Sequence, residues 1–178
     1  MRLRTSASVC LLVLVLIPSF AFSQDPFKGL ELIQPNRVQV ARDFTVPTPE
    51  GKSIKLTNYR GKVVFLNFWA TWCPPCKEEM PSMERLYQRF KDKGLVVLAV
   101  SVDAEGTPVV IPFVKAHKLT FPIGLDPKMA LAEKYGVRGL PSTFLIDKKG
   151  NLAALAVGPR EWDSKAAHAL IEFLLKQG

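Results

Sequence analysis

The chain has 178 residues, which fits one domain, or one domain with a short appendage. With 48% apolar and 22% charged residues the composition excludes intrinsic disorder, and three cysteines are too few for a disulfide-stapled scaffold. The formal net charge of +8 permits anionic partners, but no dense basic run alternates with aromatic residues, so we expect no nucleic-acid binding.

The N-terminus has the pattern of an export signal. Two arginines precede an apolar run at residues 9–17, and the small residues Ala21 and Ser23 stand before a cleavage point at Gln24. The run is far shorter than the ~20 residues that a membrane span needs, which favours a cleaved signal over a retained anchor. A lipoprotein signal fits less well, because Cys10 lies at the start of the run.

We therefore divide the chain into a signal peptide at residues 1–23, a lead-in segment at 24–42 and a folded domain at 43–178. Removal of the signal leaves two cysteines, Cys73 and Cys76. An oxidising compartment favours structural bridges, but a pair three residues apart closes too small a loop to stabilise a fold much. We therefore interpret the pair as chemical.

Strands and helices alternate along the domain. In chain order, we expect a β-hairpin at 44–56, a buried strand at 63–68, a helix at 74–90, a second buried strand at 95–100, a short helix opening at 107, a helix capped by Asp126 and stopped by Gly136, strands at 143–146 and 152–155, and a last helix capped by Asp163 or Ser164. This order predicts an α/β layer fold with helices on both faces of a mixed central sheet. The sheet is mixed because a short turn makes the last two strands antiparallel.

A cysteine motif follows the first buried strand directly. Residues 69–77 read Trp-Ala-Thr-Trp-Cys-Pro-Pro-Cys-Lys, which places Cys73 at the N-terminus of the predicted helix. The helix dipole favours an anion there, and the thiolate is the nucleophilic form of cysteine. Cys76 lies one turn deeper on the same helix face and can close a disulfide with it. The pair can therefore cycle between dithiol and disulfide through a mixed disulfide.

Two cysteines at this spacing can also form half of a zinc site. Zinc needs about four ligands, and the sequence offers no second cysteine pair. The two histidines, His117 and His168, sit on other predicted helices. We therefore expect neither a metal nor any other cofactor.

Four segments, at residues 61–81, 101–103, 121–123 and 135–147, together resemble the TlpA/ResA-like family of exported thioredoxin-fold thiol-disulfide oxidoreductases. The resemblance implies a thioredoxin-like fold, a place in the periplasm or on the outer face of the cytoplasmic membrane, and a role in cell redox homeostasis. It implies disulfide-containing exported proteins such as apocytochrome c as substrates, in cytochrome c biogenesis. It also implies a membrane thiol reductase of the DsbD/CcdA kind as electron donor. We expect a monomer.

The resemblance also implies roles for single residues. Cys73 would be the exposed nucleophile, Cys76 the resolving thiol, and Pro141 a cis-proline that faces the disulfide. Trp69 and Trp72 would flank the active site, although each has the alternative of simply packing.

Glu79 matches the acidic residue that this family carries three positions after the second cysteine. Thioredoxins proper have a buried Asp at the position of Asn67, which cannot take up a proton. We therefore expect Glu79 to act as the acid or base for Cys76, since its spacing brings it near that sulfur. A solvated helix glutamate is the alternative, which the sequence leaves open, whereas Glu78 is expected on the surface.

The two residues between the cysteines, Pro74 and Pro75, indicate the direction of the reaction. Neither has a backbone N–H or a side-chain donor, so few hydrogen bonds stabilise the Cys73 thiolate. The disulfide should then be comparatively hard to reduce and the dithiol a reductant. The sequence therefore predicts a disulfide reductase that acts on exported proteins.

Two other functions would use the same thiols. A thioredoxin-fold peroxidase favours a Pro-x-x-x-Thr-x-x-Cys site, but Thr71 lies two residues before Cys73 instead of three. A non-enzymatic metal or copper chaperone would need further soft ligands, and Met80 and Met83 are better explained as core residues.

Overall fold

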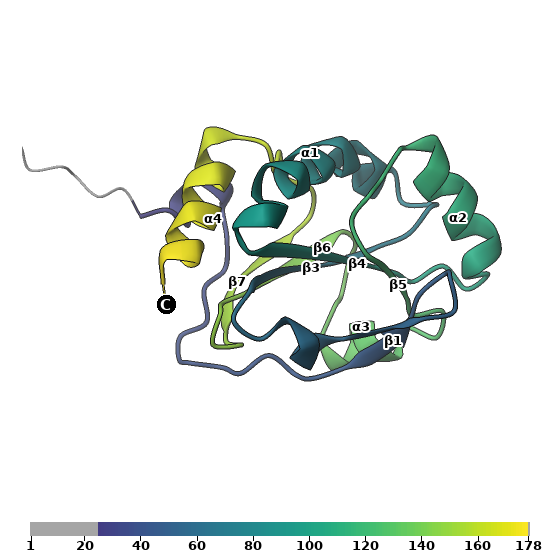
Figure 1. Ribbon diagram of the computed structural model, residues 1–178, viewed down its shortest axis with the longest axis horizontal. Coiled ribbons are helices and arrows are strands. Elements are labelled where there is room, and N and C mark those ends of the chain that lie inside the picture. The colour runs from purple at the N-terminus through teal and green to yellow at the C-terminus, as the bar shows by residue number, and fades with distance from the viewer. Residues whose placement is uncertain (1–24, 178) are drawn as a thin grey trace, which may run out of the picture.

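The computed structural model describes residues 25–177, and a single mixed β-sheet forms its centre (Figure 1). The predicted signal at residues 1–23 lies outside the described residues. The strands of this sheet are β3 (Val63–Trp69), β4 (Leu95–Ser101), β5 (Ile123–Leu125), β6 (Ser142–Ile146) and β7 (Leu152–Val157). Their spatial order is β5-β4-β3-β6-β7, with β3, β4 and β5 parallel and β6 antiparallel to both of its neighbours.

Strand β3 lies in the middle of the sheet and leads into the cysteine motif. All seven of its residues are buried, which the apolar run predicted for residues 63–68. It pairs with β4 on one edge and β6 on the other, which places Asn67 between Ala99 and Thr143. A strand that is paired on both edges and covered on both faces gives the residues at its end a rigid support.

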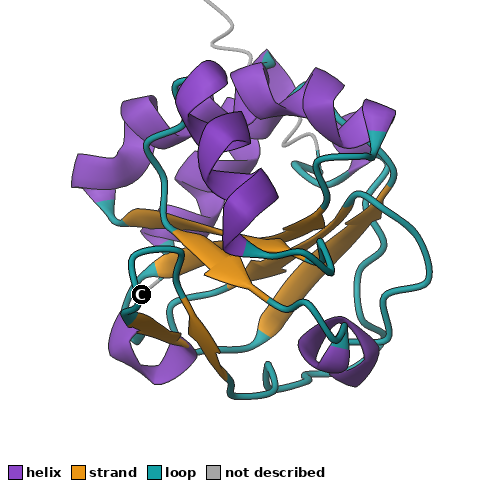
Figure 2. Ribbon diagram, turned by 90° about the vertical axis from the view of Figure 1, so that its right-hand side faces the viewer, coloured by secondary structure: helices purple, strands orange, loops and turns teal. Residues whose placement is uncertain are grey.

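Both faces of the sheet are covered, as Figure 1 and Figure 2 show. Three helices lie on one face, and a short helix lies on the other beside the N-terminal hairpin. The first group is α1 (Pro74–Phe90), α2 (Thr107–Ala116) and α4 (Lys165–Lys176), and the second is α3 (Ala130–Lys134), β1 (Thr45–Pro47) and β2 (Ser53–Lys55). The predicted mixed sheet, the helices on both faces and the antiparallel hairpin are confirmed.

The hairpin packs on strand β5 through a glycine. A Cβ atom at Gly124 would lie 2.8 Å from Cγ2 of Val46 and 3.8 Å from Cδ1 of Ile54. Since protein interiors are close-packed, a side chain at this position would push the hairpin away from the sheet.

Two local features differ from the predictions. The short strand β5 was missed, because three residues are too few for a periodic signal. Helix α3 begins at Ala130 instead of directly after Asp126, because Met129 adopts a left-handed conformation with φ 56°. The Asp126 carboxylate still accepts a hydrogen bond of 2.9 Å from the N–H of Ala132. Helix α2 opens at Thr107 as predicted and continues through Pro112.

The lead-in segment is built into the fold along strand β7. A 3₁₀ turn (Lys28–Leu30) comes first, and single β-bridges then join Ile33 to Leu155 and Val40 to Asn151. The Arg160 side chain fastens the turn by donating to the carbonyl of Leu30 at 2.7 Å. No helix within residues 25–177 is long and apolar enough to cross a membrane.

Candidate active site

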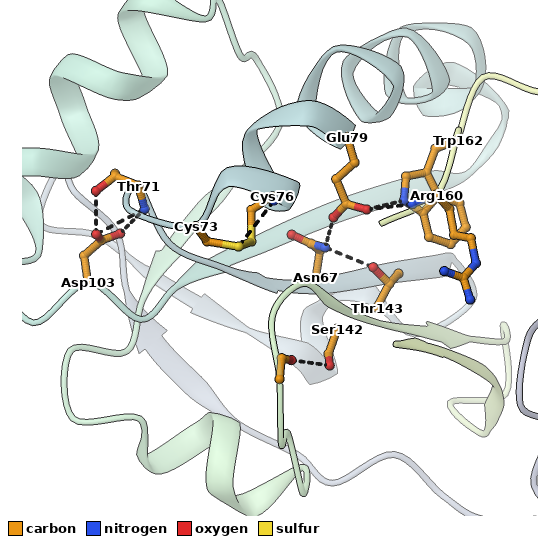
Figure 3. Close-up of a disulfide and its surroundings, with 11 residues drawn as sticks. Asn67, Thr71, Cys73, Cys76, Glu79, Asp103, Ser142, Thr143, Arg160 and Trp162 are labelled. Atoms are coloured by element: carbon orange, nitrogen blue, oxygen red, sulfur yellow. Dashed lines mark hydrogen bonds between the residues drawn. A yellow bond between two sulfur atoms is a disulfide. The ribbon is translucent and has the colours of Figure 1, made fainter. Parts of the chain in front are cut away.

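The Cys73–Cys76 disulfide lies where β3 passes into α1 (Figure 3). Its S–S distance is 2.11 Å, and Cys73 is the N-cap residue of the helix. Cys73 keeps 4% of its surface exposed and Cys76 none. Only the Cys73 side of the bridge is therefore reachable from outside, and in this disulfide form it is much less exposed than the resemblance implied.

The first turn of α1 offers the disulfide a single backbone donor. Pro74 and Pro75 occupy the first two helical positions and have no N–H. The N–H of Cys76 is the first that the helix presents, and it donates to Sγ of Cys73 at 3.3 Å. A Cys73 thiolate would thus have this bond and the helix dipole to stabilise it, as the sequence indicated.

A groove of about 440 Å³ opens beside Cys73. It is mainly apolar, and its walls come from the start of α1 and from the loops before α3 and β6. The lining residues are Trp72, Cys73, Pro74, Pro75, Met129, Val137, Arg138, Gly139 and Leu140. Trp72 is 63% exposed and Met129 is 40% exposed, so two of the large apolar side chains that line the groove stand at the surface.

The loop before β6 contains the cis peptide bond Leu140–Pro141, and Leu140 lines the groove. The hydroxyl of Ser142 donates to the carbonyl of Gly139 at 2.8 Å and closes the loop across the proline. Pro141 therefore has the conformation that the resemblance implied, while its role in the reaction stays a prediction.

Trp69 does not line the groove. It is fully buried and packs against Phe113 of α2, with 5.0 Å between ring centroids. Of the two tryptophans expected beside the disulfide, Trp72 stands at the site and Trp69 packs in the core behind it.

Glu79 is buried on the inner face of α1, whereas Glu78 is exposed. One carboxylate oxygen accepts from Nδ2 of Asn67 at 2.9 Å, and the other accepts from the indole of Trp162 at 3.0 Å and the N–H of Arg160 at 3.3 Å. Burial raises the pKa of Glu79 to about 7, and these hydrogen bonds offset part of that rise. The solvated alternative is therefore wrong, and Glu79 is a group that titrates near neutral pH.

The turn that leads into Cys73 is held by Asp103, a residue just after β4. Its buried carboxylate accepts from the N–H of Thr71 at 3.1 and 3.0 Å, from the Thr71 hydroxyl at 2.6 Å and from the Ser101 hydroxyl at 2.7 Å. These bonds fix the backbone two residues before the first cysteine. They also direct the Thr71 hydroxyl to Asp103.

Comparisons with known proteins agree with the family resemblance found in the sequence. Residues 38–155 match the AhpC/TSA family. The chain is 46% identical over 113 residues to the thiol-disulfide oxidoreductase ResA of Bacillus thuringiensis subsp. konkukian, covering 63% of this chain and 64% of that protein. It is 40% identical over 151 residues to the ResA of Bacillus thuringiensis strain Al Hakam, covering 84% and 85%. The chain belongs to the AhpC/TSA family, in its TlpA/ResA-like branch.

Solved structures confirm the thioredoxin-like fold of this ResA-like chain. A thiol:disulfide interchange protein of the thioredoxin family from Chlorobium tepidum matches with a TM-score of 0.67 and 31% identity, over 79% of this chain and 99% of that one. StoA from Bacillus subtilis matches with a TM-score of 0.61 and 34% identity, over 75% and 97%.

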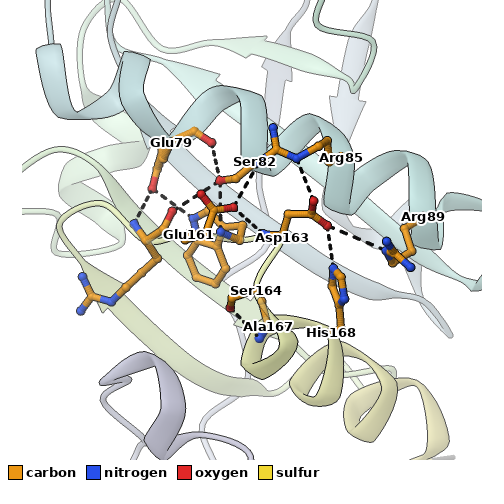
Figure 4. Close-up of polar contacts among 11 residues, drawn as sticks. Glu79, Ser82, Arg85, Arg89, Glu161, Asp163, Ser164, Ala167 and His168 are labelled. Carbon is orange, nitrogen blue, oxygen red and sulfur yellow. Dashed lines mark hydrogen bonds and ion pairs between the residues drawn. The ribbon is translucent and has the colours of Figure 1, made fainter.

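A second polar cluster of the ResA-like chain holds the loop that reaches Glu79 (Figure 4). Arg85 of α1 contacts Glu161 at 3.2 Å and Asp163 at 2.7 Å, and His168 of α4 contacts Asp163 at 2.7 Å. Hydrogen bonding to Arg85 holds the pKa of Asp163 below its usual value. Exposed pairs of this kind add little stability, but here they anchor the loop between β7 and α4 to α1.

Sequence reasoning missed three residues of this site. Arg160 and Trp162 approach Glu79 from a loop more than 80 positions away, and no local pattern points to them. Asp103 lies in a segment that resembles the family, and an acidic residue at the end of a buried strand was the available signal. Within residues 25–177, no group of three or more His, Cys, Asp or Glu side chains is placed to hold a metal.

Proposed function

We propose that this protein is an exported thiol-disulfide oxidoreductase that reduces disulfides in other exported proteins. The observation that carries the proposal is the asymmetry of the Cys73–Cys76 pair. One sulfur borders an apolar groove, and the other is enclosed on the helix face that carries the buried Glu79. A substrate can therefore reach only Cys73, and Cys76 is left to react inside the protein.

In the dithiol form, the Cys73 thiolate attacks one sulfur of a substrate disulfide. The other substrate sulfur leaves as a thiolate, and a mixed disulfide forms on Cys73. Cys76 then loses its proton, attacks Sγ of Cys73 and expels the second substrate sulfur. Two electrons have passed to the substrate, and the protein is left in its disulfide form. Glu79 is the group that takes up the Cys76 proton, because its pKa of about 7 keeps part of it ionised near neutral pH.

The proline pair supports reduction as the direction of the reaction. A strong oxidant stabilises its nucleophilic thiolate, which stabilises the reduced form. Here Pro74 and Pro75 withhold two backbone donors, and the ionised Glu79 carboxylate disfavours a second negative charge nearby. Both features destabilise the thiolate and favour transfer of electrons to a substrate.

The groove fits an extended, partly apolar substrate segment that carries the disulfide. We propose disulfide-containing exported proteins such as apocytochrome c as substrates, and a membrane thiol reductase of the DsbD/CcdA kind as the electron donor. The predicted signal at residues 1–23 and the family resemblance support export to the periplasm or to the outer face of the cytoplasmic membrane.

The two alternative functions gain less support from the site. The peroxidase pattern needs a threonine hydroxyl at the reactive cysteine, but the Thr71 hydroxyl donates to Asp103 at 2.6 Å. A metal chaperone needs thioethers near the thiols, and Met80 and Met83 are fully buried in the core. Among the described residues, Met129 is the methionine that lines the groove.

Reduction of insulin by the full chain tests the proposed function. The parent protein should catalyse it, and Cys73→Ser should abolish it. Cys76→Ser should instead arrest the mixed disulfide on Cys73, so mass spectrometry of the trapped partner would identify the substrate. Substantial activity in Cys73→Ser would overturn the assignment of the nucleophile. Rapid peroxide consumption, or a metal retained through purification, would favour one of the alternatives.

A further inference from the structure

The side-chain carbonyl of Asn67 is a buried acceptor without a hydrogen-bond partner within residues 25–177. The same side chain is otherwise well bonded, since Nδ2 donates to Oε1 of Glu79 and to Oγ1 of Thr143 at 2.9 Å each. Nearly all buried polar groups in native proteins have a partner, so an orphan next to a reactive site needs an explanation.

Two acceptors decide how the Asn67 amide is oriented. Oε1 of Glu79 and Oγ1 of Thr143 both lie 2.9 Å from the same amide atom, and because an ionised carboxylate can only accept, that atom is the nitrogen when Glu79 is ionised. A flipped amide would place its oxygen against a carboxylate oxygen. The carbonyl is thereby held on the side away from Glu79.

That side faces the disulfide. Asn67 lies on β3 beneath α1, and its bond to Glu79 places it against the inner face of the helix. Cys76 precedes Glu79 by three residues and shares this buried face. In Figure 3 the Asn67 carboxamide lies between the disulfide and Glu79, and its oxygen points toward the sulfur atoms.

We propose that, in the dithiol form, Oδ1 of Asn67 accepts a hydrogen bond from the Cys76 thiol, which keeps its proton until Glu79 takes it up during the reaction. In the disulfide form Cys76 carries no proton, so the carbonyl has nothing to accept. Reduction supplies the missing donor. This inference rests on the proposed function, because it requires the pair to cycle between its two states.

The new hydrogen bond stabilises one redox state only. Two glutathione thiols reduce the protein by breaking the Sγ–Sγ bond, leaving a proton on each cysteine and joining the glutathiones in a disulfide. The bonds from Nδ2 to Glu79 and Thr143 can exist in both states, but the bond from Cys76 to Oδ1 exists only after reduction. Asn67 therefore favours the dithiol and moderates the reducing power that the prolines confer.

The thiol–disulfide equilibrium with glutathione tests the inference, at a pH where both thiols are protonated. Asn67→Leu, which keeps the volume and removes the carbonyl, should lower the equilibrium constant for reduction about fivefold, the factor expected for a hydrogen bond of average net strength. The matched control is Thr143→Val, which removes the second acceptor of Nδ2, leaves the Asn67 carbonyl in place and should leave the constant unchanged. An unchanged or raised constant in Asn67→Leu would overturn the inference.

A second measurement needs no substitution at position 67. In the parent protein the ¹³C resonance of the Asn67 side-chain carbonyl should move downfield on reduction, because the carbonyl gains a donor. The side chain of Asn151, which is bonded to Asp147, should not respond. A static Asn67 resonance would sink the proposal even if Asn67→Leu fails to fold. Neither measurement uses a protein substrate, so insulin reduction remains an independent test of the proposed function.

Discussion

The indole of Trp162 donates a hydrogen bond of 3.0 Å to the Glu79 carboxylate, although 83 residues separate the two in the sequence. The indole ring is buried and packs edge-on against Phe65 with 4.6 Å between ring centroids. Asn67 binds the other carboxylate oxygen. The carboxylate of Glu79 is thus buried deeply enough to raise its pKa, and it keeps enough donors to remain able to ionise.

We expect Trp162→Phe to raise the pKa of Glu79 above its value of about 7. The hydrogen bond from the indole stabilises the ionised carboxylate, and phenylalanine keeps an aromatic ring but has no donor. A ¹³C titration of the Glu79 carboxyl group measures the change. Phe65→Leu is the control, because it loosens the packing of the indole without removing the donor. An identical pKa in Trp162→Phe and the parent would contradict the bond.

The same pKa predicts how stability depends on pH. The pKa of Glu79 is about 7 in the folded protein against an ordinary value of 4.5, so between these values the folded state binds more protons than the unfolded state. The free energy of unfolding should therefore fall as pH rises through this range, by on the order of 3 kcal/mol from this group.

Glu79→Gln should lack this component of the pH dependence. Denaturant unfolding of the disulfide form at pH 4.5 and at pH 7 measures it in both proteins. The free energy of unfolding should be larger at pH 4.5 than at pH 7 by a greater amount in the parent than in the variant. Equal differences in the two proteins would show that Glu79 ionises with an ordinary pKa.

Glu79→Gln should also change the chemistry of the thiols. An ionised carboxylate disfavours a nearby thiolate, so its removal should lower the pH at which iodoacetamide alkylates Cys73. The variant should also resolve mixed disulfides more slowly, because Cys76 loses its proton acceptor. Glu78→Gln is the matched control, since Glu78 is exposed one position away. If the titrations and turnover of both variants overlay the parent, Glu79 has no part in the reaction.

Local patterns predicted the part of the fold that carries the cysteines. The apolar run at residues 63–68 and the proline-started helix are strong signals, because a buried strand and a helix N-terminus each have their own residue preferences. The predicted start of α3 was wrong because the backbone of Met129 adopts a left-handed conformation that residues other than glycine rarely adopt. No propensity at positions 126–129 indicates that irregularity.

The surroundings of Glu79 were beyond prediction for a different reason. The spacing from Cys76 placed its carboxylate on the inner face of α1, but burial depends on what covers that face. The cover comes from Arg160 and Trp162, on a loop held to the helix by the pair of Arg85 and Asp163. Such contacts arise only from the packing of β7 and α4 against α1, so the sequence left open whether Glu79 is solvated.

The reduction potential of the disulfide should lie on the reducing side of that of the DsbA-type oxidants, which is about −120 mV. Pro75 occupies the second helical position and withholds a backbone donor from the Cys73 thiolate. Pro75→His should raise the potential, because it restores an N–H and adds an imidazole between the cysteines. Pro75→Ala restores the N–H alone and should raise the potential less. Equilibration with glutathione gives each value, and about 30 mV corresponds to a tenfold change in the equilibrium constant. If both variants match the parent, or the parent itself lies at the potential of the strong oxidants, the proline pair does not set the direction of the reaction.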